Sequence, residues 1–426
     1  MQPLLPRHLT AELHEALLAS RVVNVIGPRQ SGKTTLVRDL FGTGRYVTLD
    51  DTTVLRALEE DAFGQLTALL DEADSTPLII DEAQRSTGLA IAVKRIVDTT
   101  RQKGRFILTG SSNVFASQNV VDSLPGRIRT LTLWPMAVSE LERIGPPRIL
   151  DWALSRNPTL TGLPDPARLT RDGYIDYVIR GGFPETRMLD TRQRNRQYRD
   201  YVDSVVDRDV ADIVPVRKTD ALRRLIDQMA SRTAAEVNVA GLAGDIGIER
   251  PTVMRYIDVL ERLLVVRKLG AWTSGEAKRE IKHPKYHFVD TGVASALRRI
   301  TADTFAADAN PTALGPMLET FAHGELVKSL PFQERDIRLY HWRGANKAEI
   351  DVVADAGDGL VGIEVKASTA VAAGDVRTLR WFGAEGPGRA RRFTGIVFYL
   401  GTERLTFGDR IFALPVSQLW SQAGQA

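Results

Sequence analysis

The sequence of 426 residues contains no cysteine. Disulfide-stapled folds, thiolate zinc sites, iron–sulfur clusters and cysteine nucleophiles are therefore excluded. Histidine is also scarce, since the chain has only 6, and none belongs to an H-E-x-x-H metal-binding pattern. Only His283 and His287 are four residues apart, and without further ligands nearby we interpret them as an ordinary pair on the surface.

Long apolar runs are absent as well. No stretch reaches the roughly 18 consecutive apolar residues that a membrane-spanning helix needs, and the N-terminus lacks the basic region and apolar run of a secretory signal. Neither sign of charge dominates, because 56 Lys and Arg against 53 Asp and Glu give a net charge of +3. We therefore expect a soluble cytoplasmic protein of two to four domains without a membrane partner, in which any nucleic-acid contact comes from local basic patches.

A phosphate-binding loop is the strongest motif that is present. The apolar run Val22–Ile26 predicts a buried parallel strand, and G-P-R-Q-S-G-K-T follows it, directly before a helical pattern. Glycines let backbone N–H groups curl around phosphates, and the helix N-terminus adds its positive end. Lys33 can then reach the β- and γ-phosphates of ATP, and the Thr34 hydroxyl can bind Mg²⁺. The expected nucleotide-binding residues are Gly27, Pro28, Arg29, Gln30, Ser31, Gly32, Lys33, Thr34 and Thr35.

A second motif supports this assignment. Residues 77–80 are apolar and are followed by Asp81 and Glu82, which predicts a strand that ends in two carboxylates. At that strand end Asp81 can hold Mg²⁺ through water, and Glu82 can polarise the attacking water. Together with the P-loop, the pair indicates ATP hydrolysis.

Further strands are expected at residues 46–50, 105–109 and 130–134. Their alternation with helical segments predicts an α/β fold, with a parallel sheet, helices on both faces and ligands at the carboxyl ends of the strands. Beyond the strand at 105–109, Ser111 could sense the γ-phosphate, although a polar turn without this role is the alternative. Arg127 could act as an arginine finger on the ATP of a neighbouring subunit in a homo-oligomer, or be an ordinary surface arginine.

The middle of the chain begins with a proline- and charge-rich boundary at residues 145–175. A helical run then stops at G-G-F-P-E, residues 181–185. Residues 192–199 contain arginines without an acid, and three of these arginines fall on one helical face that could contact DNA phosphates. Because several aspartates follow at once, we favour a solvated, internally paired face.

Residues 237–264 predict a helix-turn-helix. Val239, Leu242 and Ile246 have helical spacing, Gly247 breaks the run, and a second helix opens near Arg250. The residues expected to be exposed on that second helix are Arg250, Thr252, Arg255 and Tyr256. Two strand-like runs at 264–269 and 285–290, with a basic segment at 278–282 between them, predict a wing. Such a winged helix could bind DNA or contact only a protein partner.

The last part of the chain carries a nuclease-like set of residues. A helix is expected to bear Glu319, and strands at 340–343, 349–353 and 362–366 to follow it. The period of two places Glu364 and Lys366 on one strand face, and Asp351 can stand beside Glu364 on the partner strand. Two carboxylates can hold a second divalent metal, with Lys366 placed to orient or deprotonate a water. The alternative is a hairpin with a surface Glu–Lys pair.

The whole pattern resembles the bacterial and archaeal AAA-type ATPases of the additional-strand P-loop class that are fused to a C-terminal domain of unknown function. The resemblance covers nearly the full length, on Gly27 to Thr35, Leu78 to Gln84, Gly126-Arg127, residues 181–185, Lys285 to Gly292 and Tyr340 to Ser368. It implies an ATPase core, then a winged helix, then a restriction-endonuclease-like fold. It also implies that Lys33 and Thr34 contact the nucleotide, that Asp81 and Glu82 act at Mg²⁺ and water, and that Asp351, Glu364 and Lys366 form the nuclease signature.

We therefore expect an ATPase core at 1–145, a helical lid at 146–232, a winged helix at 233–300 and a nuclease-like domain at 301–426. One interpretation is a Mg²⁺-dependent ATPase that binds DNA and cleaves it through the C-terminal domain. The other is a switch without cleavage, in which ATP alters the grip of the winged helix on DNA or on a protein. Metal-dependent cleavage of bare DNA distinguishes the two.

Overall fold

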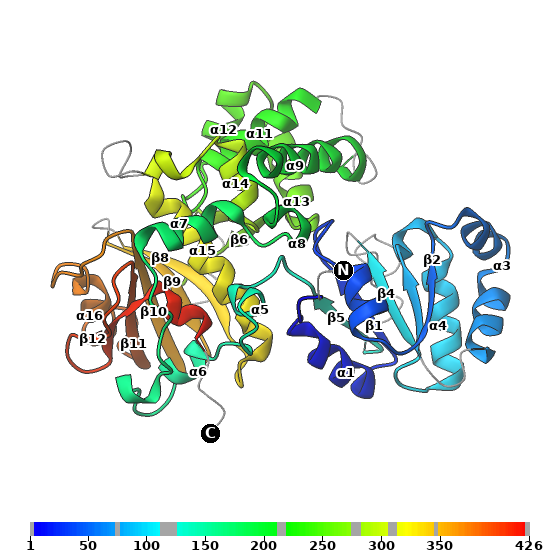
Figure 1. The fold of residues 1–426 in the computed structure, drawn as a ribbon, viewed down its shortest axis with the longest axis horizontal. Helices are drawn as coiled ribbons and strands as arrows, with labels where there is room; N and C mark the ends of the chain where they lie inside the picture. Colours follow the sequence, from blue (N-terminus) through cyan, green and yellow to red (C-terminus); the bar gives the residue numbers. More distant parts are fainter. Residues whose placement is uncertain are drawn as a thin grey trace. The chain divides into compact units, whose positions relative to one another are not determined.

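The computed structural model describes residues 4–72, 77–110, 126–210, 219–273, 283–305, 313–344 and 348–421. The chain forms two compact units, one made of Met1–Met136 and Arg262–Leu264 and the other of Ala137–Glu261 and Val265–Ala426 (Figure 1). Within the described residues, no helix combines the length and the apolar character needed to cross a membrane.

The first unit contains a parallel sheet, as the α/β prediction requires. Its 5 strands lie in the order β2-β3-β4-β1-β5 (Figure 1). Their bounds are Val22–Ile26 for β1, Arg45–Thr48 for β2, Leu78–Asp81 for β3, Phe106–Gly110 for β4 and Ile128–Thr132 for β5. β4 separates β1, which leads into the P-loop, from β3, which ends at Asp81. Because all strands are parallel, both of these ends lie at the same edge of the sheet.

Helices cover both faces of this sheet, because successive residues of each strand point to opposite sides. Val23, Ile79 and Ile107 pack on the side of α1, while Leu78 and Phe106 pack on the side of α3 and α4. The helices are α1 at Leu9–Ala19, α2 at Lys33–Thr35, η1 at Leu36–Leu40, α3 at Thr52–Asp71, η2 at Ala83–Arg85 and α4 at Leu89–Thr100. The α/β class is confirmed.

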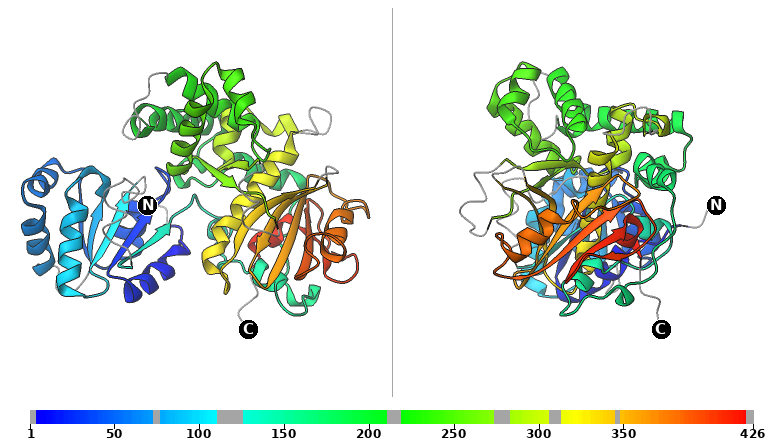
Figure 2. Two further views of the ribbon diagram at one scale, coloured as in Figure 1. Left: turned by 180° about the vertical axis from the view of Figure 1, so that it is seen from behind. Right: turned by 90° about the vertical axis from the view of Figure 1, so that its left-hand side faces the viewer.

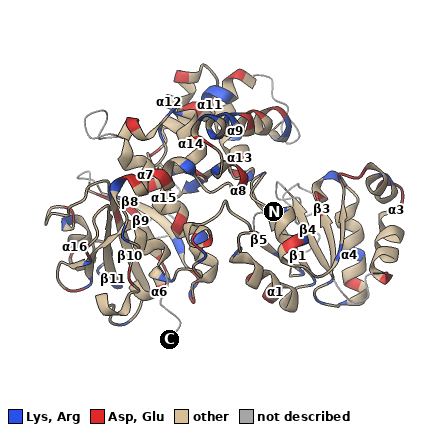
Figure 3. Cartoon of the chain, viewed as in Figure 1, with Lys and Arg blue, Asp and Glu red and all other residues tan. Residues whose placement is uncertain are grey.

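The second unit begins with short helices and continues as a helical region. The bounds are α5 at Val138–Leu141, α6 at Ile149–Ala153, η5 at Leu160–Gly162, α7 at Arg171–Arg180, α8 at Pro184–Arg187, α9 at Thr191–Ser204, η6 at Val205–Asp209 and α11 at Thr219–Ser231. Basic and acidic residues are mixed along α9 and η6 (Figure 3). Arg223 on α11 binds Asp203 at 3.1 Å and Asp207 at 3.0 Å, so these aspartates are paired within the unit.

The motif G-G-F-P-E ends α7 and connects it to α14 (Thr291–Leu297). Asp290 caps α14 by accepting from the backbone of Gly292, and its other oxygen accepts from the N–H of Gly182 at 2.6 Å. Gly181 has φ +67°, and a Cβ there would lie 2.2 Å from the Asp290 carboxylate. The glycines and Asp290 therefore form a structural joint between two segments that are distant in sequence.

The predicted helix-turn-helix region folds as α12 (Val239–Ile246) and α13 (Arg250–Arg262), joined by Gly247 at φ +78°. Antiparallel β6 (Val266–Leu269) and β7 (Lys285–Phe288) follow. The predicted basic segment at 278–282 lies outside the described residues. Arg250 and Arg255 are exposed, but Tyr256 is only 2% exposed, so its expected exposure is wrong. It lies on the same helical stripe as Val253 and Leu260, which faces the core.

The C-terminal part forms a second sheet in the order β12-β13-β11-β10-β9-β8, which is coloured orange to red in Figure 2. The strands β8, β9 and β10 are antiparallel neighbours, whereas β10, β11 and β13 are parallel. Their bounds are Arg338–Arg343 for β8, Glu349–Asp355 for β9, Gly359–Lys366 for β10, Arg392–Tyr399 for β11, Leu405–Thr406 for β12 and Ile411–Pro415 for β13. The remaining elements are η8 at Ala302–Phe305, α15 at Leu314–Ser329, η9 at Leu330–Phe332, α16 at Arg377–Ala384 and η10 at Val416–Trp420.

Candidate functional site

The P-loop connects β1 to α2 in the geometry that nucleotide binding requires. Gly32 has φ +92°, and a Cβ at Gly27 would lie 2.3 Å from the carbonyl oxygen of Leu133, so both positions need glycine. Lys33 donates hydrogen bonds to the carbonyl oxygens of Gly27 at 3.0 Å and Pro28 at 2.9 Å. Its ammonium group thus lies within the loop where phosphates would bind.

Thr34 and Asp81 meet although 47 positions separate them in sequence. The Thr34 hydroxyl donates to Asp81 Oδ2 at 2.7 Å, at the edge of the sheet where β1 and β3 both end. Mg²⁺ prefers oxygen ligands, so the Thr34 hydroxyl and the Asp81 carboxylate are suitable ligands for this ion. The structure therefore brings together the two residues that the sequence analysis expected at this ion.

Two residues that the sequence analysis missed also contact Asp81. The Tyr46 hydroxyl donates to Oδ2 at 2.8 Å, and the buried Thr109 hydroxyl donates to Oδ1. Burial and the Asp81 carboxylate both raise the pKa of Tyr46, so this hydroxyl stays a donor at neutral pH. Tyr46 lies within β2 and Thr109 near the end of β4, and these are the two strands that flank β3.

Glu82 directly follows β3, where the chain makes a sharp turn. Its backbone has φ +56° and ψ +40°, a left-handed conformation that is uncommon for any residue other than glycine. The Gln84 amide donates to the Glu82 carboxylate. Such locally unfavourable backbone often marks a functional position.

A further missed residue is Arg7, which precedes α1. It donates to the Ser31 carbonyl oxygen at 2.7 Å and to the Trp134 carbonyl oxygen at 2.6 Å. Arg7 thereby links the P-loop to the segment that follows β5. A lone N-terminal arginine carries no sequence pattern that would predict this contact.

Two further residues, Ser111 and Arg127, were considered for an ATP site. Ser111 lies outside the described residues. Arg127 lies at the amino end of β5, on the opposite edge from the P-loop of its own subunit, and it binds Asp98 at 2.5 Å. A role for Arg127 in its own ATP site is therefore excluded, and a role on a neighbouring subunit stays a prediction.

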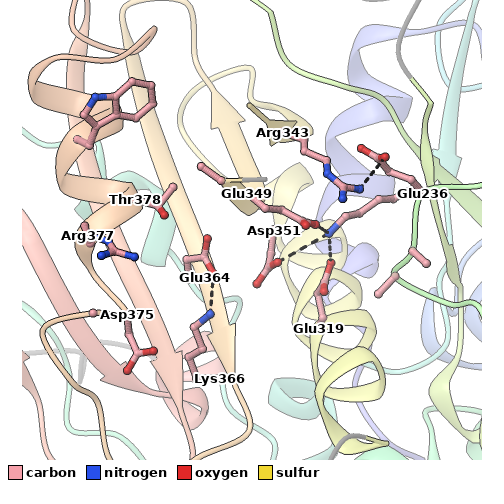
Figure 4. A pocket seen from close by; sticks show the side chains of 16 residues that line it. Glu236, Glu319, Arg343, Glu349, Asp351, Glu364, Lys366, Asp375, Arg377 and Thr378 are labelled. Atoms are coloured by element: carbon pink, nitrogen blue, oxygen red, sulfur yellow. Dashed lines mark hydrogen bonds and ion pairs between the residues drawn. The ribbon is translucent and has the colours of Figure 1, made fainter. Parts of the chain in front are cut away.

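The three residues of the nuclease-like set line one pocket of about 840 Å³ in the second unit (Figure 4). Asp351 on β9 accepts a hydrogen bond from the backbone N–H of Val365 at 2.9 Å, which fixes it beside Glu364 on β10. Lys366 Nζ lies 3.0 Å from Glu364 Oε2. Glu319 on α15 and Glu349 on β9 line the same pocket.

A second lysine, which the sequence analysis did not single out, lies among these carboxylates. Lys285 on β7 is 2% exposed, and its Nζ lies 2.8 Å from Glu319 Oε1 and 3.7 Å from Asp351 Oδ1. It also forms an ion pair with Glu349. In Figure 4 dashed lines mark these ion pairs of Glu319, Glu349 and Asp351. A lysine at the start of an otherwise buried strand was the only signal in the sequence.

This pocket has more negative charge than its lysines neutralise. Burial and the neighbouring Asp351 raise the pKa of both Glu319 and Glu364 to about 8, despite the contacts with Lys285 and Lys366. The pKa of Glu349, in contrast, is lowered by Lys285, which outweighs the effect of its partial burial. At neutral pH the negative charge of the cluster is therefore reduced in two ways, by protons on Glu319 and Glu364 and by the ammonium groups of the two lysines.

The described side chains of this pocket do not form a preformed site for a divalent metal. Across the described ranges, no group of three or more carboxylate or histidine side chains is placed to hold a metal ion. The second metal at Asp351 and Glu364 therefore stays a prediction.

The expectation that His287 lies on the surface is wrong, because this histidine is fully buried and stacks on His323, with the two ring centres 4.1 Å apart.

Comparison with known proteins supports the assignment of the first unit. Residues 19–142 match a family described as an AAA domain, and residues 171–304 and 314–419 match two domains of unknown function, DUF8612 and DUF4143. The uncharacterized proteins Mb2031c of Mycobacterium bovis and Rv2008c of Mycobacterium tuberculosis are each 27% identical over 415 residues, which covers 97% of this chain and 84% of theirs. The Walker-type ATPase paby2304 of Pyrococcus abyssi has a TM-score of 0.41 and 14% identity, covering 68% of this chain and 94% of that one. The match of residues 19–142 to the AAA domain shows that this part of the chain is an ATPase-like P-loop domain.

Proposed function

We propose that this protein is a Mg²⁺-dependent ATPase that works as a switch on DNA without cleaving it. The observation that carries the ATPase part is the contact of 2.7 Å between the Thr34 hydroxyl and Asp81 Oδ2, next to the P-loop lysine. Bound Mg²⁺ would screen the charge of the phosphates. Lys33 would bind the phosphate oxygens, Thr34 and Asp81 would hold the ion, and Glu82 would orient and polarise a water.

ATP turnover tests this part of the proposal. Wild-type protein is expected to release phosphate from ATP only with Mg²⁺ present, and Lys33→Ala is expected to lose nucleotide binding because the phosphate clamp is gone. Lys103→Ala is a matched control, since this exposed lysine precedes β4 at the opposite edge of the sheet. Normal turnover by Lys33→Ala would refute the assignment.

DNA binding is proposed for the second unit, through α13. Arg250 and Arg255 are exposed on this helix, which follows α12 across the Gly247 turn as a DNA-reading helix does in a helix-turn-helix. The order α11, α12, α13, β6 and β7 is consistent with a winged helix. A protein partner is the alternative, and lack of DNA binding at low salt, with and without ATP, would favour it.

Cleavage of DNA by the C-terminal pocket is the second candidate function. It is favoured by the meeting of Asp351, Glu364 and Lys366 in one pocket. It is disfavoured by Lys285, whose ammonium already contacts the carboxylates that a metal would need. Incubation of supercoiled plasmid with the protein and Mg²⁺ or Mn²⁺ distinguishes the two, because nicking that Asp351→Asn abolishes would establish the nuclease.

A further inference from the structure

We propose that Lys285 serves as the built-in cation of the C-terminal pocket and excludes divalent metal from it. The proposal concerns this pocket alone and is independent of ATP hydrolysis and of DNA binding. It begins with three carboxylates, Glu319, Glu349 and Asp351, that come from two different elements and all contact one ammonium group.

The pocket is built to receive a cation. Glu319 and Asp351 both contact the Nζ atom of Lys285. Glu364 is 6% exposed and lines the same cavity. The Oε1 atom of Glu364 has no hydrogen-bond partner among the described residues, although it is buried. A buried carboxylate oxygen without a partner is costly, so this atom marks a place where positive charge would be stabilising.

Lys285 neutralises Glu319, Glu349 and Asp351 from outside the nuclease-like segment. It lies at the start of β7, whose backbone pairs with β6 and also forms a bridge to Glu236. Its position is thereby fixed by the sheet, and its ammonium is already dehydrated and in place once the protein has folded. A Mg²⁺ or Mn²⁺ ion that used Glu319 and Asp351 together would have to occupy the place of the Lys285 ammonium.

Replacement of Lys285 should therefore create a metal site. In Lys285→Met the carboxylates keep their places but lose their common cation, and we expect Mn²⁺ affinity to rise by roughly tenfold or more, as expected when repulsion between buried carboxylates is relieved by a metal. Lys328→Met is the matched control. Lys328 is a largely buried lysine on α15 that pairs with Glu325 at 2.8 Å, outside the residues that line the pocket.

The experiment is a calorimetric titration of the full chain with Mn²⁺ in the absence of nucleotide. Subtracting the heat of the corresponding Asp351→Asn variant removes binding elsewhere, including at the P-loop. Wild type and Lys328→Met should show no binding that depends on Asp351, whereas Lys285→Met should show it. Equal Asp351-dependent binding in wild type and Lys285→Met would overturn the proposal, as would its absence from both.

Thermal unfolding provides a second readout that requires no activity. Mn²⁺ should raise the melting temperature of Lys285→Met in a concentration-dependent way and leave that of wild type unchanged. If Lys285→Met is unfolded without metal, Mn²⁺ should restore its fold, and Lys285→Gln, which keeps a hydrogen-bond donor, should show the same Mn²⁺-dependent stabilisation. Failure of Mn²⁺ to stabilise or refold either variant contradicts the proposal.

Discussion

The Tyr46 hydroxyl and the Thr34 hydroxyl donate to the same oxygen of Asp81, at 2.8 and 2.7 Å. Tyr46 comes from β2, the neighbour of β3 in the sheet, and Thr34 comes from α2, which follows the P-loop. Asp81 is therefore held in one orientation before any nucleotide arrives. Tyr46 is a positioning residue, because it acts on Asp81 and not on the phosphates.

The first prediction concerns Tyr46→Phe. Loss of a hydrogen bond to a charged acceptor costs about 1.5 kcal/mol, which corresponds to roughly tenfold in rate. We expect the Mg²⁺ concentration needed for half-maximal turnover to rise and kcat to fall by about this factor, while the melting temperature changes little. Steady-state ATPase assays over a range of Mg²⁺ concentrations measure the effect. An unchanged Mg²⁺ dependence would show that Tyr46 has no role in orienting Asp81.

The second prediction concerns Glu82. Glu82→Gln keeps the size of the side chain but removes the carboxylate that would polarise water, so the protein should bind ATP normally and hydrolyse it at least about a hundredfold more slowly. Nucleotide affinity and single-turnover hydrolysis are measured together. Full turnover in this variant would assign the role to another residue.

The third prediction concerns DNA. If Arg250 and Arg255 neutralise phosphates, affinity for a DNA duplex should fall with salt, with a logarithmic slope near −0.9 for each phosphate contacted. Each of the substitutions Arg250→Ala and Arg255→Ala should reduce that slope by about one. Arg168→Ala, an exposed arginine on a loop of the same unit, is the control and should leave the slope unchanged. An unaltered slope in both α13 variants would exclude this helix as the DNA contact.

The fourth prediction concerns pH. Glu364 has a pKa of about 8 in the folded protein against 4.5 for an ordinary glutamate, so folding favours its protonated form. That contribution to stability is complete below pH 4.5 and is lost as the pH rises to about 8. Glu364→Gln cannot ionise, so the difference between its free energy of unfolding and that of wild type should grow by several kcal/mol as the pH rises over this range.

Chemical unfolding at pH 5 and pH 8 measures this difference. Glu385→Gln is the control, since Glu385 is exposed at the end of α16, and its curve should run parallel to that of wild type. A constant difference between wild type and Glu364→Gln across the two pH values would contradict the prediction.

The fifth prediction concerns Gly181. A Cβ at this position would lie 2.2 Å from Asp290 Oδ1 and 2.7 Å from the Tyr198 hydroxyl, in a backbone conformation with φ +67°. Gly181→Ala should therefore destabilise the second unit by about 3 kcal/mol. Gly244→Ala on α12, where a Cβ would meet nothing within 4 Å, should have little effect or stabilise the helix. Urea unfolding of the two variants compares them directly.

Local patterns were enough to predict the ATPase-like half. A strand, the glycine-rich loop and the lysine of the P-loop are consecutive in sequence, and Asp81 directly follows an apolar strand. Because parallel strands place their carboxyl ends at one edge, the meeting of Thr34 and Asp81 follows from the order of the elements. Arg127 precedes the strand predicted at 130–134, so the same rule places it at the opposite edge from the P-loop of its own subunit.

Only the tertiary structure decided the character of the C-terminal pocket. The sequence brought Asp351, Glu364 and Lys366 into neighbouring strands, because the hairpin of β9 and β10 is local. Lys285 belongs to β7 and precedes Asp351 by 66 residues in the sequence. Its contact with three carboxylates results from packing between distant segments, and no periodicity or spacing in the chain encodes it. The same holds for His287, which is buried because the surrounding elements cover it. Sequence thus determined which chemical groups were available, and the packing of distant segments determined which cation neutralises them.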